Sequence, residues 1–172
     1  LASVFIVISC LSAKALAQAQ DADPLEAEKR QLLANYEAAL AKGDRVAAIK
    51  YLLDFTEDTE GETSPVTVKL THRYGHALYQ AGEHRKATGV LKQALERSIA
   101  AHGESGGDAF EINMNIAYAY SKWSPSLSSR MKYFDRALEI LRERGEHESV
   151  EYVTTLVNIV VNLMDNDGLG GD

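Results

Sequence analysis

Hydrophobic residues recur along most of the chain at intervals of three and four, the spacing that gathers them on one face of an α-helix. Polar or glycine-containing turns separate these segments. No segment alternates between hydrophobic and polar residues as a half-buried strand would. The pattern predicts an all-α chain of antiparallel helix pairs, expected at about 25–60, 64–102 and 108–144, with a final helix at 148–164.

Several helix boundaries carry residues with clear capping preferences. Ser64 followed by Pro65 predicts a helix start, because a serine side chain accepts bonds from free backbone N–H groups and proline suits the first turn. Asp108 is expected to cap the third pair in the same way. Two stretches are expected to be turns that follow helices, the acidic segment 56–61 and the Asp-Asn-Asp-Gly segment 165–168.

Three glycines, Gly61, Gly103 and Gly145, stand at a constant interval of 42 residues, and each is followed by glutamate. Each comes at the end of a predicted helix and shortly before the next one. A helix stop that recurs at one period indicates a repeated supersecondary unit, which is the mark of a solenoid.

The second helix pair resembles a tetratricopeptide-repeat hairpin. Small residues on such a hairpin let its two helices approach closely, while a bulky residue fills the space between them. The residues that carry the resemblance have successive spacings of 3, 4, 5, 4 and 3, and they are Gly75, Leu78, Gly82, Ala87, Leu91 and Ala94.

The 42-residue period resembles the extended variant of this repeat found in kinesin light chains and many bacterial relatives. The resemblance covers about 25–164 and implies a right-handed α-solenoid of about three hairpins and a final unpaired helix. The first pair keeps the spacings, but Tyr36 and Phe55 stand where small residues are usual. The third fits if one residue is inserted in the turn after Trp123, which places Arg130 where alanine is expected; Trp123 is expected to pack that turn.

The final predicted helix, 148–164, is apolar on nearly all sides, so it is expected to be covered on more than one side. A partner helix would begin just after 168, close to the last residue. We interpret the chain, with its tail at 169–172, as truncated at its C-terminus. Self-association through helix 148–164 is the alternative.

The first 17 residues are expected to be a cleaved signal peptide, followed by a polar linker at 18–24. An apolar run of signal-peptide length is followed by small residues, and cleavage is expected after Ala17. The run is too short to span a membrane. A periplasmic or secreted protein is therefore expected. The alternative is a lipoprotein anchored through Cys10, because the residues before it resemble a lipobox.

Composition removes several classes of function. With 18 basic and 25 acidic residues the net charge is −7, which argues against a nucleic-acid partner. Cys10 is the sole cysteine. His72 and His76 share a helix face, as two zinc ligands would, but no third ligand is evident. The segment 165–168 lacks the glutamate of a calcium loop. We expect no metal, no cofactor and no enzyme activity.

The resemblance implies that the first helix of each hairpin lines a concave groove that holds a peptide or partner protein. The groove is basic and aromatic at its centre, which favours an acidic or carboxylate-terminated ligand. The alternatives are a solvated spacer, or the N-terminal scaffold of a longer envelope protein. The expected groove residues are Arg30, Lys69, His72, Arg73, His76, Tyr79, Gln80, Asn115, Tyr118 and Lys122.

Overall fold

The computed structural model describes residues 24–124 and 126–166, and in these residues it contains seven helices and no strand. The prediction of an all-helical chain is therefore confirmed for this part of the sequence. The expectations for the signal peptide, the linker before Pro24 and the tail lie outside the described residues. The helices are α2 (Pro24–Ala41), α3 (Arg45–Glu60), α4 (Pro65–Gln80), α5 (His84–His102), α6 (Ala109–Trp123), α7 (Leu127–Glu143) and α8 (Val150–Asn166).

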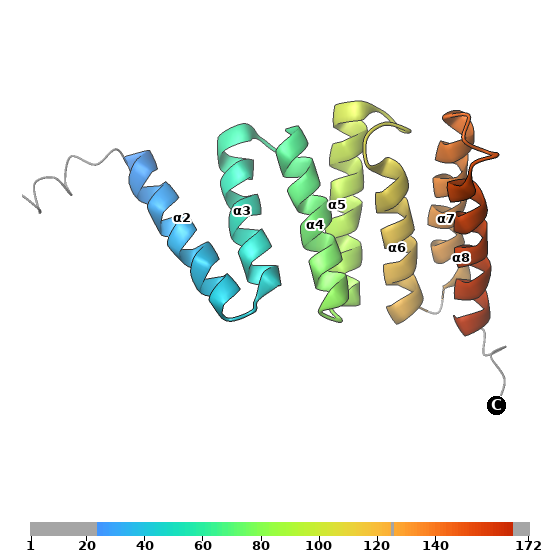
Figure 1. The fold of residues 1–172 in the computed structure, drawn as a ribbon, viewed down its shortest axis with the longest axis horizontal. Helices are drawn as coiled ribbons and strands as arrows, with labels where there is room; N and C mark the ends of the chain where they lie inside the picture. Colours follow the sequence, from blue (N-terminus) through green and yellow to red (C-terminus); the bar gives the residue numbers. More distant parts are fainter. Residues whose placement is uncertain (1–23, 125, 167–172) are drawn as a thin grey trace, which may run out of the picture.

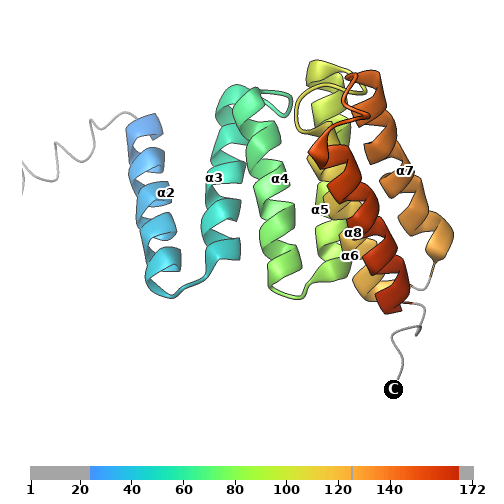
Figure 2. The same cartoon turned by 45° about the vertical axis from the view of Figure 1, so that its right-hand side comes forward.

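Consecutive helices run antiparallel and follow one another across the molecule in chain order (Figures 1 and 2). Each helix contacts the next, and α6 also contacts both α4 and α8. These three helices form one face, which is turned to the viewer in Figure 1. In the described residues α2 makes no comparable contact with α4, so the N-terminal helix stands away from that face.

The three glycines of the 42-residue interval end helices in the same way. Gly61 and Gly103 are the C-cap residues of α3 and α5, and Gly145 follows the C-cap of α7. Their φ angles are 85°, 81° and 76°, a region in which only glycine avoids a clash of its side chain with the backbone. The next pair starts as predicted at Ser64, whose hydroxyl accepts a bond from the Thr67 amide at 3.1 Å.

Three local predictions were wrong. The segment 56–61 is not a turn, because α3 continues to Glu60, and Thr56 is buried. The segment 165–168 begins as helix, because α8 extends to Asn166; the rest of it lies outside the described residues. Asp108 precedes α6 but makes no side-chain capping bond, and its φ of −87° and ψ of 13° depart from the extended geometry of a capping residue.

The core lies in α4–α7 and in one side of α8. In the second pair Gly75 allows close packing, since a Cβ there would lie 2.7 Å from Leu91 Cγ. Arg130, the misfit in the third pair, is accommodated with 4% exposure. Two clusters of buried residues make up the core, one of Leu78, Ala87, Leu91, Ala94, Ile112, Ile116 and Ala119, the other of Met114, Ala117, Phe134, Ala137, Leu138 and Ile159.

In the described part of the chain, no helix combines the length and the apolar character needed to cross a membrane.

Candidate partner-binding face

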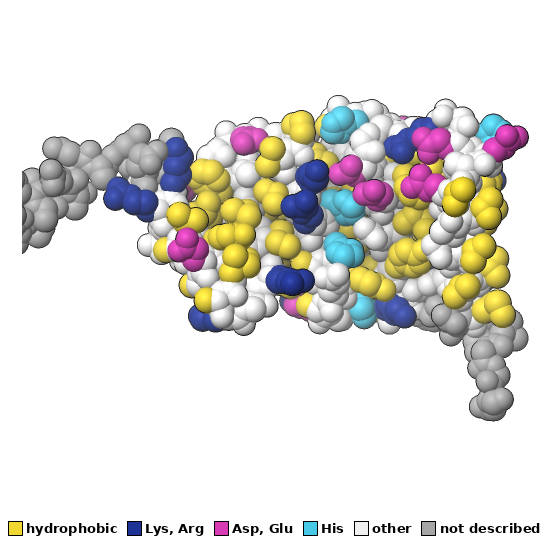
Figure 3. All heavy atoms as spheres, viewed as in Figure 1, with side chains coloured by type: hydrophobic (Ala, Val, Ile, Leu, Met, Phe, Trp, Pro, Cys, Tyr) yellow, Lys and Arg dark blue, Asp and Glu magenta, His cyan; other side chains and the backbone are white. Residues whose placement is uncertain are grey.

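The α4 helix presents a polar stripe because its hydrophobic and polar residues are segregated. Val68, Thr71 and Leu78 are buried on the side that packs against neighbouring helices. Cations and histidines at intervals of three and four project from the opposite side. Figure 3 shows Lys, Arg and His side chains gathered over this part of the face. We call the following set the α4 stripe: Lys69, His72, Arg73, His76, Tyr79 and Gln80.

The stripe is not uniformly accessible. Lys69, Arg73, His76 and Gln80 are exposed, so their charges and amide can reach a ligand. His72 and Tyr79 are half-buried between helices. The exposed members are therefore the candidates for direct contact, and the half-buried members hold the stripe in place.

His72 joins α4 to α6. Its Nε2 lies 2.8 Å from Asn115 Nδ2, and because an amide nitrogen can only donate, the ring nitrogen accepts. Burial lowers the pKa of His72 below its ordinary value; Asp108 opposes this shift, while His76 and Arg73 reinforce it. A neutral imidazole with its proton on Nδ1 fits both observations.

Aromatic residues continue the face from α4 to α8. The rings of His76 and Tyr79 are stacked with centroids 6.5 Å apart. Burial raises the pKa of Tyr118 on α6; nearby Tyr79 acts in the same direction, and a hydrogen bond with Asn158 on α8 opposes it. Tyr118 also meets Phe134 edge to face at 5.6 Å. The structure thus brings Tyr79, Asn115 and Tyr118 together as one surface.

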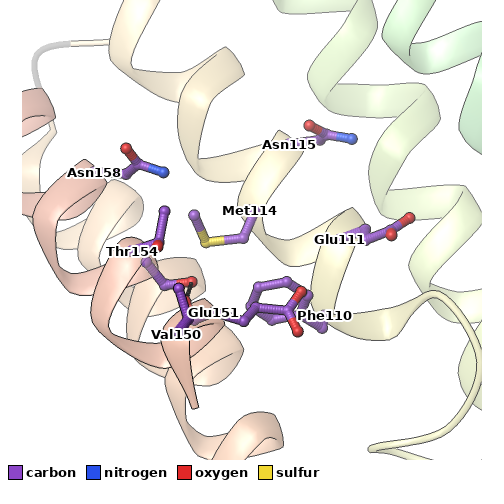
Figure 4. A pocket seen from close by; sticks show the side chains of 9 residues that line it. Phe110, Glu111, Met114, Asn115, Val150, Glu151, Thr154 and Asn158 are labelled. Carbon is purple, nitrogen blue, oxygen red and sulfur yellow. Dashed lines mark hydrogen bonds between the residues drawn. The ribbon is translucent and has the colours of Figure 1, made fainter.

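A cavity of about 570 Å³ lies between α6 and α8 on the same face. Figure 4 shows Met114 between the two helices, with Thr154 and Asn158 on the α8 wall. The carboxylates of Glu111 and Glu151 also line it. The face is therefore divided in charge, basic on α4 and acidic toward α8.

Two predicted groove residues lie at the margins. Arg30 is exposed on α2, the helix that makes no contact with α4. Lys122 is exposed in the last turn of α6. Its neighbour Trp123 does not pack the following turn, as expected, but belongs to α6 and donates from Nε1 to Thr88 Oγ1 at 2.8 Å, with 40% of its surface exposed.

The sequence reasoning missed a second, apolar surface, which we call the N-terminal groove. It consists of two adjoining cavities of about 490 and 390 Å³ that share Leu52 and Phe55 of α3 as lining residues. The unusual Tyr36 and Phe55 were the available signal. The groove is lined by Lys29, Leu32, Leu33 and Tyr36 of α2, Leu52, Phe55 and Thr56 of α3, and Pro65, Val66, Lys69, Leu70 and Arg73 of α4.

The chemistry available on this face is that of binding. Ammonium, guanidinium and imidazole groups can form charge-assisted bonds with carboxylates, and the tyrosine rings offer apolar contact. In the described residues no group of three His, Cys, Asp or Glu side chains could hold a metal ion. No protein-family model and no curated protein matched this chain.

Proposed function

We propose that this chain is an exported tetratricopeptide-type solenoid that binds an acidic segment of a partner protein on the α4 stripe. Three observations support a repeated hairpin. The helices are antiparallel and contact their neighbours in order, the glycine ends recur every 42 residues, and Gly75 receives Leu91 as a small-residue position should. The proposed fold is right-handed, and its groove face is made by α4, α6 and α8.

The exposed cations of the α4 stripe are the observation that carries the proposed function. Lys69 and Arg73 are exposed, and His76 lies one turn further along. They project from a protein whose net charge is −7, so they form a local region of opposite sign. Such a region attracts carboxylates from a distance and excludes cationic ligands, which makes acidic peptides the best-suited class.

The proposal is tested with fluorescein-labelled peptides of twelve residues rich in Asp and Glu, made with a free or an amidated C-terminus. Fluorescence polarisation is measured for the wild type and for Lys69→Glu/Arg73→Glu. Exposed ion pairs contribute up to about 1 kcal/mol each, so reversing two charges is expected to weaken binding about tenfold or more. Stronger binding of the free-carboxylate peptide would identify a chain end as the ligand.

The matched control is Lys86→Glu/Lys132→Glu, which changes the net charge equally but alters exposed residues of α5 and α7. Its affinity is expected to stay within about twofold of the wild type, because general repulsion between distant exposed charges is screened by salt. Equal losses in the two variants would show a bulk charge effect and reject the site. Absence of binding by the wild type would favour the solvated spacer.

A further inference from the structure

Two apolar surfaces of this chain lie at opposite ends of the helix row. One is the N-terminal groove formed by α2, α3 and α4, and the other is the outer side of α8 (Figure 1). We propose that α8 of one copy docks into the N-terminal groove of a second copy, so that the protein associates head to tail. This inference does not rest on the acidic-peptide function.

The groove side offers an apolar floor with a basic rim. Leu52 and Phe55 line both of its cavities, and Leu70 lines the wall on α4. Its charged lining residues are Lys29, Lys69 and Arg73, all of them cations. A segment that enters should therefore carry aliphatic side chains in its middle and negative charge at its margin.

The α8 side has this chemistry. Val153, Val157, Val160 and Met164 follow one another at intervals of four, three and four, so they form a ridge along the helix. They are 55%, 55%, 53% and 50% exposed. The sequence of α8 includes Glu and Asp but no Lys or Arg. We call these four residues the α8 ridge.

Packing inside the molecule keeps the α8 ridge turned outward. Thr155 and Ile159 are buried at 3% and 6% exposure, and Ile159 belongs to the cluster that contains Met114 and Phe134. This inner contact fixes the rotation of α8 about its axis. The ridge therefore cannot turn inward without the loss of buried apolar area.

The dimensions and positions of the two surfaces also agree. The α8 helix has 17 residues, and the helices that wall the groove have 16 to 18. At 1.5 Å per residue each is roughly 25 Å long. The two surfaces lie at opposite ends of the row in both views, so one chain does not bring its own pair together (Figures 1 and 2). The contact must be heterologous and forms open chains or closed rings.

Charge favours this pairing over a contact between two copies of α8. Ridge against ridge would place Glu151 and its neighbours near a second set of acidic residues and would leave the groove empty. Ridge against groove pairs acidic residues with cations and covers both apolar surfaces at once.

Sedimentation velocity of the full chain between about 1 and 100 μM tests the proposal with two single variants. Phe55→Glu places a charge in the groove, and Val157→Glu places one on the ridge. We expect the mass of the wild type to rise with concentration and each variant to stay at the mass of one chain. Leu127→Glu is the matched control, because Leu127 is 45% exposed on α7 and should associate like the wild type.

A mixture of the two variants discriminates between the modes of association. Phe55→Glu keeps an intact ridge and Val157→Glu keeps an intact groove, so an equimolar mixture is expected to form pairs that grow no further. Association of Phe55→Glu at the wild-type level would show ridge-to-ridge contact and overturn the proposal. A wild type that stays monomeric throughout would overturn it too, and would favour cover by another part of a longer chain.

Crosslinking provides a test with gentler substitutions. In a Cys10→Ser background, which removes the sole cysteine, Leu52→Cys and Val157→Cys chains are mixed and oxidised. The proposal predicts that the mixed 52–157 disulfide exceeds the 157–157 product severalfold. A dominant 157–157 product would contradict it. These variants leave Lys69 and Arg73 in place, so failure here and failure of peptide binding remain distinguishable.

Discussion

The first helix pair, α2 and α3, and the second, α4 and α5, share one spacing of packing residues but differ in how closely they pack. In the second pair Leu91 is fully buried against Gly75, and Ala94 is fully buried as well. In the first pair the equivalent leucine, Leu52, is half-buried and lines an open groove.

The residues that differ explain the contrast. At the position of Gly75 the first pair has Tyr36, and at the position of Ala94 it has Phe55. A tyrosine ring occupies the space into which a leucine would otherwise insert, so the helices are held apart. The small residues common to both pairs, Ala48 and Ala87, are buried alike. The size of two side chains therefore separates a closed pair from an open one.

The largest expected effect is a difference between two equivalent leucines. Leu91→Ala removes a fully buried side chain and should lower the free energy of unfolding by about 2–5 kcal/mol. Leu52→Ala removes a half-buried one and should cost about 1 kcal/mol or less. Urea unfolding followed by circular dichroism measures both. Equal losses would mean that the first pair is as well packed as the second.

A buried ion pair links the first pair to the second. Arg97 on α5 is 5% exposed and donates to Glu57 Oε1 on α3 at 2.5 Å and to Thr71 Oγ1 at 2.8 Å. Glu57→Ala removes an acceptor from a buried cation and should cost about 2 kcal/mol. Glu62→Ala is the control, since that exposed partner lies 3.8 Å away and should contribute below about 0.5 kcal/mol.

A reversed order of these two losses would show that Glu57 is not the principal partner of Arg97. The same urea titrations report it.

The close approach at Gly75 should reverse the usual effect of adding a methyl group to a helical glycine. Gly75→Ala brings Cβ to 2.7 Å from Leu91 Cγ, and the overpacking should leave a net loss of about 1 kcal/mol. Gly89→Ala on α5 meets nothing within 4 Å and should stabilise the protein by about 0.5–1 kcal/mol. Thermal unfolding of both variants gives the signs. Stabilisation by Gly75→Ala would remove the explanation offered here for the closed pair.

The smallest effect is a dependence of stability on pH. The pKa of His72 is lowered mainly by burial, so the unfolded chain binds more protons than the folded one between the lowered value and about 6.5. Stability from this group is complete above about 6.5 and is lost as the pH falls through the lowered pKa. His72→Gln should flatten that slope, whereas the non-titrating control Gln80→Ala should retain it. An unchanged slope in His72→Gln would contradict the assignment.

The sequence predicted the helices well because helix formation is recorded locally. The periodicity located all seven described helices, and the positive-φ glycines mark their ends as expected. The extension of α3 through 56–60 was not predictable in this way. It is accompanied by the contact between Glu57 and Arg97, which are 40 residues apart in the sequence.

The candidate site was predictable only in part. The α4 stripe follows from spacing on one helix. The bond between His72 and Asn115 depends on how α4 and α6 pack laterally, which spacing does not define. The N-terminal groove depends on a distance between helices. Tyr36 and Phe55 stood out in the sequence, but only the three-dimensional arrangement shows that they leave α2 away from α4.

Hydrogen exchange on the monomeric Phe55→Glu variant at low concentration tests most directly whether the first pair is the open one. The account predicts that amides in α2 exchange at least about tenfold faster than those in α4 and α5, corresponding to about 1.4 kcal/mol less protection. Protection in α2 equal to that in α4 and α5 would contradict it.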